Sequence, residues 1–207
     1  KLDLFAALLR EAPVTWQGTT RAALTNQRVY PPVERGRLPV WVGVGGSRES
    51  VVRAARHGLP LMLAIISGDP ARFALYTDLY RRALSGFGSP AQPVGAHSPG
   101  HVADTDAQAR EELWPHYAAM MSRIGAERGW PPVSRAGFDR EAGPGGALCV
   151  GSPETVARKI AVTVRSLGLS RFDMKYSNGT LPHDSLMRSI ELYGTHVVPR
   201  VRELLAS

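Results

Sequence analysis

The sequence predicts a parallel α/β fold in which strands alternate with covering helices along the chain. Segments of strand length occur at 39–44, 60–66, 92–97 and 171–176, and amphipathic helical patterns accompany them. The first two segments are nearly continuously apolar, which is typical of parallel strands buried on both faces. Four βα units are half of an eight-stranded barrel, and an open doubly wound sheet is the structural alternative.

The first 37 residues precede this alternation. Residues 3–11 form a predicted short helix with leucines on one face, and prolines and glycines indicate a loop over 13–37. We expect a single domain over residues 1–207. In it, 1–37 provide a helix and a covering loop, and 38–207 provide the βα units.

Helix boundary signals define the later elements. In chain order we expect strand 39–44 and helix 47–57, then strand 60–66 and helix 70–84. Strand 92–97 follows, with a loop at 98–100 and a helix near 105–125. After a Gly/Pro-rich excursion at 129–146 we expect a helix from Ser152, strand 171–176, and a helix from Asp184 to about residue 205. Ser47, Asp69, Ser152 and Asp184 are the predicted N-caps. Pro199 should kink or break the last helix.

Composition excludes several classes of protein. The net charge of +7 suggests nucleic acid, but the basic residues are scattered beside acidic ones and are not interleaved with aromatics, so we expect no nucleic-acid partner. No apolar run reaches the ~18 residues of a membrane span. The single cysteine, Cys149, lies in an apolar run, which predicts a buried thiol in a reducing compartment. With no leader pattern at the start, we expect a cytoplasmic protein without a membrane partner.

The segment 38–52 carries the strongest functional signal. It reads as a buried strand, a glycine turn and a helix capped by Ser47. Gly45 and Gly46 allow backbone N–H groups to turn outward at the positive end of the helix dipole, which is a ready site for a phosphate. An ordinary well-capped βα turn is the alternative, because a short glycine turn is a weak motif.

Two further residues are candidates for chemistry. His97 ends a predicted strand, where it could polarise a carbonyl or donate a proton, or simply bond a neighbouring loop. Lys175 ends the last predicted strand, and only one of Lys175 and Tyr176 can face the barrel interior. A salt bridge in that interior is the alternative role for Lys175. His97 and His101 are four apart, but the intervening Pro-Gly removes helical geometry, so we expect no metal site.

Several stretches of the chain resemble the C-terminal half of the bacterial luciferase-like flavin monooxygenases. They are LPVWVGVGGSRES at 38–50, GLPLMLA at 58–64, CVGSPETV at 149–156, RFDMKYSNGTLPH at 171–183 and LMRSIELY at 186–193. Their order and spacing cover nearly the whole chain from about Val29 onward. The resemblance implies a (βα)₈ TIM barrel that binds reduced FMN or, in some branches, coenzyme F420, with only the C-terminal four βα units in this chain.

The resemblance also implies site residues and partners. Gly45, Gly46, Ser47 and Ser50 would hold the cofactor phosphate. The flavin would then oxidise an unidentified small molecule, and a separate reductase is one source of reduced flavin. His97 and Lys175 are the expected catalytic residues.

Strands one to four of the barrel lie outside this sequence, which leaves open edges that a homodimer could bury. A truncated chain, a remnant of a longer one and a natural half-barrel all remain open. Two alternatives to an enzyme are a non-enzymatic flavin-binding half-barrel that dimerises and a half-barrel with no cofactor.

Overall fold

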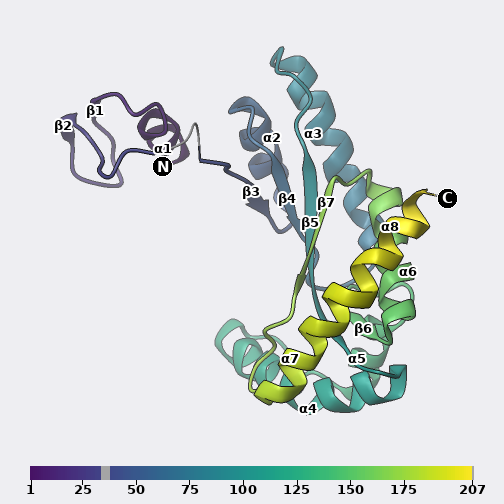
Figure 1. Ribbon diagram of the computed structural model, residues 1–207. Helices are drawn as coiled ribbons and strands as arrows, with labels where there is room; N and C mark the ends of the chain where they lie inside the picture. The colour runs from purple at the N-terminus through teal and green to yellow at the C-terminus, as the bar shows by residue number, and fades with distance from the viewer. Residues whose placement is uncertain (34–37, 207) are drawn as a thin grey trace. The chain divides into compact units, whose positions relative to one another are not determined.

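The structure is a computed structural model that describes residues 1–33 and 38–206 (Figure 1). The chain divides into two compact units, Lys1–Trp41 and Val42–Ser207. The predicted boundary at residue 37 lies outside the described residues, and the single domain over 1–207 remains a prediction.

The first unit contains a helix and a small antiparallel sheet. Helix α1 spans Leu2–Leu8, and strands β1 (Val14–Trp16) and β2 (Leu24–Gln27) pair with each other. The prediction of a loop throughout 13–37 is therefore wrong for these two strands. They have three and four residues, which is too short for an alternating pattern to register in the sequence.

The second unit is built on a five-stranded sheet in which every pairing is parallel, which confirms the predicted α/β class. Its strands are β3 (Val42–Val44), β4 (Leu61–Ala64), β5 (Val94–Val102), β6 (Cys149–Gly151) and β7 (Arg171–Lys175). Strands β3, β4 and β5 are neighbours in that order, and both β6 and β7 pair with β5. Strand β6 is additional to the four predicted strands.

Strand β5 is longer than predicted. It continues through residues 98–100, where the sequence indicated a loop. Pairing with β7 ends at Pro99, and pairing with β6 begins at Gly100, so these residues lie where β5 changes partner. A Cβ atom on Gly100 would come within 2.6 Å of the Cys149 carbonyl oxygen. Glycine is therefore required here by the close approach of β6, and not by a turn.

The helices follow the predicted order with three differences. They are α2 (Arg48–Arg56), the 3₁₀ turn η1 (Pro70–Phe73), α3 (Ala74–Gly86), α4 (Asp106–Arg128), α5 (Arg135–Ala142), α6 (Pro153–Leu167), α7 (His183–Leu192), the π turn η2 (Tyr193–Val197) and α8 (Val198–Ala206). Helix α5 lies inside the predicted excursion. Asp184 is not an N-cap, because α7 begins one residue earlier at His183. Pro199 does not end the last helix, which instead widens into η2 just before it.

The main core lies on one face of the sheet. Val44, Leu61, Leu63, Val94 and Ala96 point to this face and pack with residues of α2 and α3. Phe172 and Met174 of β7 also pack into core clusters. Because side chains alternate along a strand, the residues between them point to the opposite face. We call it the open face, defined by Gly43, Ala64, His97, Asp173 and Lys175.

Candidate cofactor-phosphate site

The predicted glycine corner connects β3 to α2. Ser47 is the N-cap of α2, and its Oγ accepts the N–H of Ser50 at 3.2 Å. Gly46 has a φ of +128°, a conformation that side chains rarely adopt. The Tyr76 hydroxyl donates to the Gly46 carbonyl oxygen at 2.8 Å. The turn is thus fixed from α3 as well as by its own cap.

Three consecutive N–H groups at this corner have no acceptor. Among the described residues, nothing accepts a hydrogen bond from the backbone N–H of Gly46, Ser47 or Arg48. The first N–H groups of a helix have no partner within the helix, and the helix dipole adds positive potential there. An anion is the ligand that such a corner favours.

A carboxylate from the same turn takes up two other donors of the corner. The Ser47 hydroxyl donates to Glu49 Oε2 at 2.8 Å. The backbone N–H of Glu49 and this hydroxyl together lower the pKa of the Glu49 carboxyl. The Ser47 hydroxyl is therefore directed at Glu49. The backbone N–H groups of Gly46, Ser47 and Arg48 are not bonded to this carboxylate.

A cavity of about 250 Å³ adjoins the corner. It is lined by Gly45, Gly46, Ala64, Ile66, Ser67, Asp69, Arg72, Phe73, Leu75 and Tyr76. Arg72 brings a guanidinium from η1, and the sequence reasoning missed it. The signal that could have indicated it is the Asp69 cap, which accepts the N–H of Ala71 at 2.8 Å and so starts the turn that carries Arg72.

A second capped corner, before α6, is already occupied by a side chain. Asp106 accepts the N–H of Ser152 at 2.6 Å and the hydroxyl of Thr155 at 2.9 Å. Burial works to raise the pKa of Asp106, but these hydrogen bonds outweigh it and leave the pKa below its ordinary value. The protein's own carboxylate therefore satisfies this corner, and Ser152 is the N-cap of α6, as predicted.

The predicted catalytic residues both lie on the open face. His97 is in register with Ala64 on one side and Asp173 on the other. Asp173 Oδ1 accepts from Arg171 Nε at 2.8 Å. Lys175 is exposed and is in register with Pro99, further along β5. No hydrogen bond or ion pair among the described residues joins His97 to Lys175.

His101 is buried, and its Nε2 lies 2.8 Å from Glu112 Oε2. Its ring therefore contacts α4, and no hydrogen bond among the described residues links it to His97. In the described part of the chain, no group of three His, Cys, Asp or Glu residues is arranged to hold a metal ion. None of the described helices is both long and apolar enough to cross a membrane.

Comparison with solved structures identifies the fold. A monooxygenase from Streptomyces bottropensis is 21% identical, with a TM-score of 0.71 over 96% of this chain and 59% of that one. The oxygenating constituent of 3,6-diketocamphane monooxygenase from Pseudomonas putida, in complex with FMN, is 15% identical, with a TM-score of 0.69 over 97% and 61%. A coenzyme F420-dependent tetrahydromethanopterin reductase from Methanopyrus kandleri is 15% identical, with a TM-score of 0.62 over 97% and 61%.

These likenesses show that the sheet is part of a TIM barrel, as predicted. The chain spans between 59% and 61% of the length of these three structures, which is consistent with a partial barrel. No curated protein sequence matches the chain significantly. The family model for luciferase-like monooxygenases matches residues 1–171. This match covers most of the chain, which therefore belongs to the luciferase-like monooxygenase family.

Proposed function

We propose that this chain binds the phosphate of FMN or F420 at the Gly45-Gly46-Ser47 corner and forms part of an oxidoreductase that acts on a small molecule. One observation carries the proposal. The N–H groups of Gly46, Ser47 and Arg48 lack acceptors among the described residues, beside a cavity that Arg72 lines. Family membership supports the same reading, because the solved neighbours include an FMN complex and F420-dependent enzymes.

The roles of the chain's own residues follow from their positions. The unpaired N–H groups and the Arg72 guanidinium would bind the phosphate, and the hydroxyl of Ser50 would be a further donor. Tyr76 would hold the turn in shape through its bond to Gly46. The bound cofactor would supply the redox chemistry, as a carrier of hydride or an activator of O₂.

His97 would serve as the proton donor or acceptor. Strands β3 and β5 are two strand spacings apart, so His97 lies about 10 Å across the sheet from the end of β3. A ligand held by its phosphate at the corner can therefore place a ring over His97. Lys175, exposed at the end of β7, would attract an anionic group of the substrate.

A second copy of the chain would complete the barrel interior. Among the described residues, β3 pairs only with β4, and β7 pairs only with β5, so each has an unpaired edge. Sedimentation of the purified chain tests this part of the proposal, since a homodimer should persist at micromolar concentration. If that dimer binds flavin without oxidising any substrate, the non-enzymatic alternative replaces the enzymatic one.

The decisive experiment is a titration followed through individual amides. We expect FMN, F420 and inorganic phosphate each to shift the ¹⁵N–¹H signals of Gly46, Ser47 and Arg48. The signals of Ser152 and Thr155 provide an internal control, because Asp106 already fills that corner.

Arg72→Gln should weaken binding several-fold, whereas Arg82→Gln, a residue outside the cavity lining, should not change it. If the three corner signals stay in place while other residues shift, the phosphate site lies elsewhere and the proposal fails.

A further inference from the structure

One carboxylate joins the cavity beside the phosphate corner to a distant part of the chain. Glu141 lies in α5, inside the predicted excursion at 129–146. Its Oε1 and Oε2 atoms accept the backbone N–H of Gly68 at 3.0 and 2.9 Å, and Oε2 also accepts the N–H of Ala147 at 3.1 Å. The carboxylate thus connects the segment after β4 to the segment before β6.

Residues 66–69 depend on this contact. They follow β4 and lie in no helix or strand. Just before them, the N–H of Ile65 donates to the His97 carbonyl oxygen at 3.0 Å. Among the described residues, the only hydrogen bonds that tie 66–69 to a distant part of the chain are the two from Gly68 to Glu141. A charged acceptor makes such bonds stronger than bonds between neutral groups, so Glu141 is the main polar restraint on this segment.

The restrained segment leads to the cation of the cavity. Ser67 and Asp69, on either side of Gly68, line the cavity beside the corner. Asp69 accepts the N–H of Ala71 and so starts η1, which carries Arg72. A Cβ atom on Gly68 would lie 3.8 Å from Arg72 Nη1, so the guanidinium lies close to the Gly68 backbone. A shift of Gly68 would therefore move Arg72 relative to the corner.

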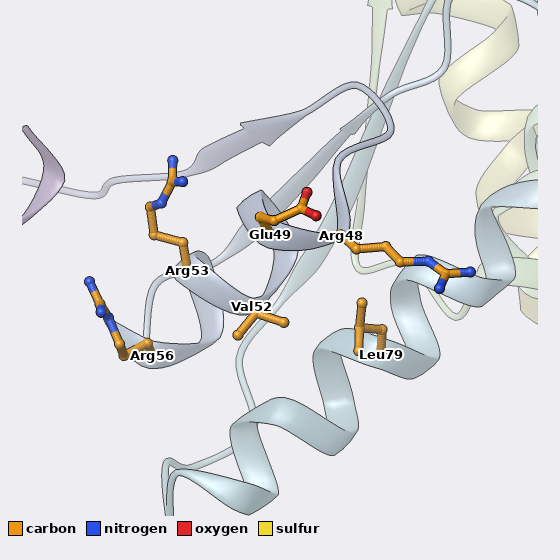
Figure 2. A pocket seen from close by; sticks show the side chains of 6 residues that line it. All are labelled: Arg48, Glu49, Val52, Arg53, Arg56 and Leu79. Atoms are coloured by element: carbon orange, nitrogen blue, oxygen red, sulfur yellow. The ribbon is translucent and has the colours of Figure 1, made fainter.

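No other basic side chain takes this place in the cavity. Arg72 is the only basic residue among the described residues that line it. Arg48 has an unpaired N–H at the corner, but its side chain extends toward α3 and lines a separate groove with Leu79 (Figure 2). The position of the Arg72 guanidinium therefore determines how much a side chain adds to the backbone donors in binding a phosphate.

We propose that Glu141 is a positioning residue of the phosphate site. Its carboxylate holds Gly68 and thereby sets where the Arg72 guanidinium lies, without touching the ligand itself. This inference rests on the proposed function, because it needs Arg72 to bind phosphate. It also gives the excursion a role at the site, since α5 supplies the restraint from 73 residues further along the chain.

The test compares the affinity for inorganic phosphate with the stability of the fold. Affinity is read from the amide shifts of Gly46, Ser47 and Arg48, and stability from urea unfolding. Glu141→Ala should weaken phosphate binding several-fold, but by no more than Arg72→Gln, because it acts through Arg72. Loss of a negative charge would by itself strengthen the binding of an anion, so a weaker affinity reports positioning. Glu141→Gln keeps one acceptor oxygen, so its loss should be smaller, and it provides the comparison if Glu141→Ala does not fold.

A matched variant and a double variant separate positioning from general loosening. Lys159→Met removes the ammonium that donates to the backbone carbonyl of Glu141, and so loosens the same excursion, but it leaves the two bonds from Gly68 in place. It should lower the urea midpoint without changing phosphate affinity. In the Arg72→Gln background, Glu141→Ala should cause no further loss of affinity, because two residues that act through one contact are not additive.

Hydrogen exchange tests the restraint without a ligand. The N–H groups of Ala71 and Arg72 both donate to Asp69 at the start of η1. They should exchange faster in Glu141→Ala and at the original rate in Lys159→Met. Unchanged exchange in both variants would contradict the restraint.

The outcomes distinguish the two proposals. If phosphate shifts the corner amides but Glu141→Ala binds it as tightly as the unmodified chain or more tightly, the positioning role is overturned and the phosphate site stands. Equal losses of affinity in Glu141→Ala and Lys159→Met, or additive losses with Arg72→Gln, overturn it too, because they indicate general loosening. If phosphate shifts no corner amide in the unmodified chain, the proposed function fails and this inference fails with it.

Discussion

Lys159 joins three segments of the second unit through its ammonium group, so we expect Lys159→Met to destabilise the fold. The Nζ atom donates to the carbonyl oxygens of Gly143 and Leu148, each at 2.6 Å, and of Glu141 at 3.2 Å. These carbonyls belong to the end of α5 and the residue before β6, while Lys159 itself lies in α6. Burial lowers the pKa of Lys159, because removal from water disfavours the charged ammonium.

The size of the effect follows from which carbonyls keep a partner. Methionine has a similar length but no donor. The Glu141 carbonyl still accepts the N–H of Leu148, and the Gly143 carbonyl still accepts the N–H of Gly146. The Leu148 carbonyl loses its charged donor, at a cost of about 1–3 kcal/mol. Relief of the ammonium's desolvation offsets part of the three lost bonds, so we expect a net loss of roughly 2 kcal/mol.

Thermal and urea unfolding measure this loss. For a chain of this size, 2 kcal/mol corresponds to a fall in Tm of roughly 4–8 °C. Arg158→Met is the matched control, since Arg158 is exposed and its bond to Glu154 should contribute less than about 1 kcal/mol. The pKa of Lys159 is lower in the folded state than in the unfolded chain. The unfolded chain therefore binds more protons between these two pKa values, and the free energy of unfolding rises with pH across that range. Equal Tm values for the two variants would refute the reasoning.

Three more substitutions test other parts of the structure. Gly46→Ala should cost about 1–3 kcal/mol because of its φ of +128°, and it should weaken FMN binding. A Cβ on Gly86, at the end of α3, meets nothing within 4 Å, so Gly86→Ala should do neither; urea midpoints with and without FMN decide this. The pKa of Asp106 is lowered in the folded state, so its carboxylate adds to the free energy of unfolding above the unfolded pKa, and this contribution is lost as pH falls through the folded pKa. Asp106→Asn should therefore make the free energy of unfolding less dependent on pH in the acid range. Burial raises the pKa of Cys149 from 9.0 to about 11, so its contribution is present below pH 9 and is lost as pH rises toward 11; Cys149→Ala should flatten that alkaline limb in the same urea assay.

Local signals predicted much of the second unit correctly. Ser47, Asp69 and Ser152 each cap the predicted helix, because a cap is a bond between a side chain and an N–H group two or three residues later. Asp184 has the same residue type as a cap, yet α7 starts before it with Pro182 at the N-cap position. Residue type therefore predicts that a helix begins nearby, while neighbouring residues decide at which position.

Features that depend on distant contacts were not readable from the sequence. The extension of β5 through Pro99 and Gly100 depends on β6, whose Cys149 is some fifty residues further along. At the candidate site, the sequence indicated the corner but not Arg72, because its relevance depends on η1 lying beside the end of β3. The direction of the Glu49 carboxylate likewise depends on a side-chain rotamer and not on spacing.

The two capped corners show why a short glycine–serine motif cannot by itself predict an anion site. Each places a serine at the N-cap of a helix directly after a strand and a glycine of positive φ. At Ser152 a carboxylate from α4 satisfies the corner, and a Cβ on Gly151 would lie 2.7 Å from that Asp106 oxygen. At Ser47 the nearest carboxylate is Glu49, which bonds the hydroxyl and its own N–H and leaves the preceding N–H groups unpaired among the described residues. The two corners therefore differ in the origin of the neighbouring carboxylate. Asp106, from a distant helix, accepts the N–H group at Ser152 and takes the place of a ligand. Glu49, from the same turn as Ser47, leaves the N–H groups there available to a ligand and disfavours ligands of high negative charge.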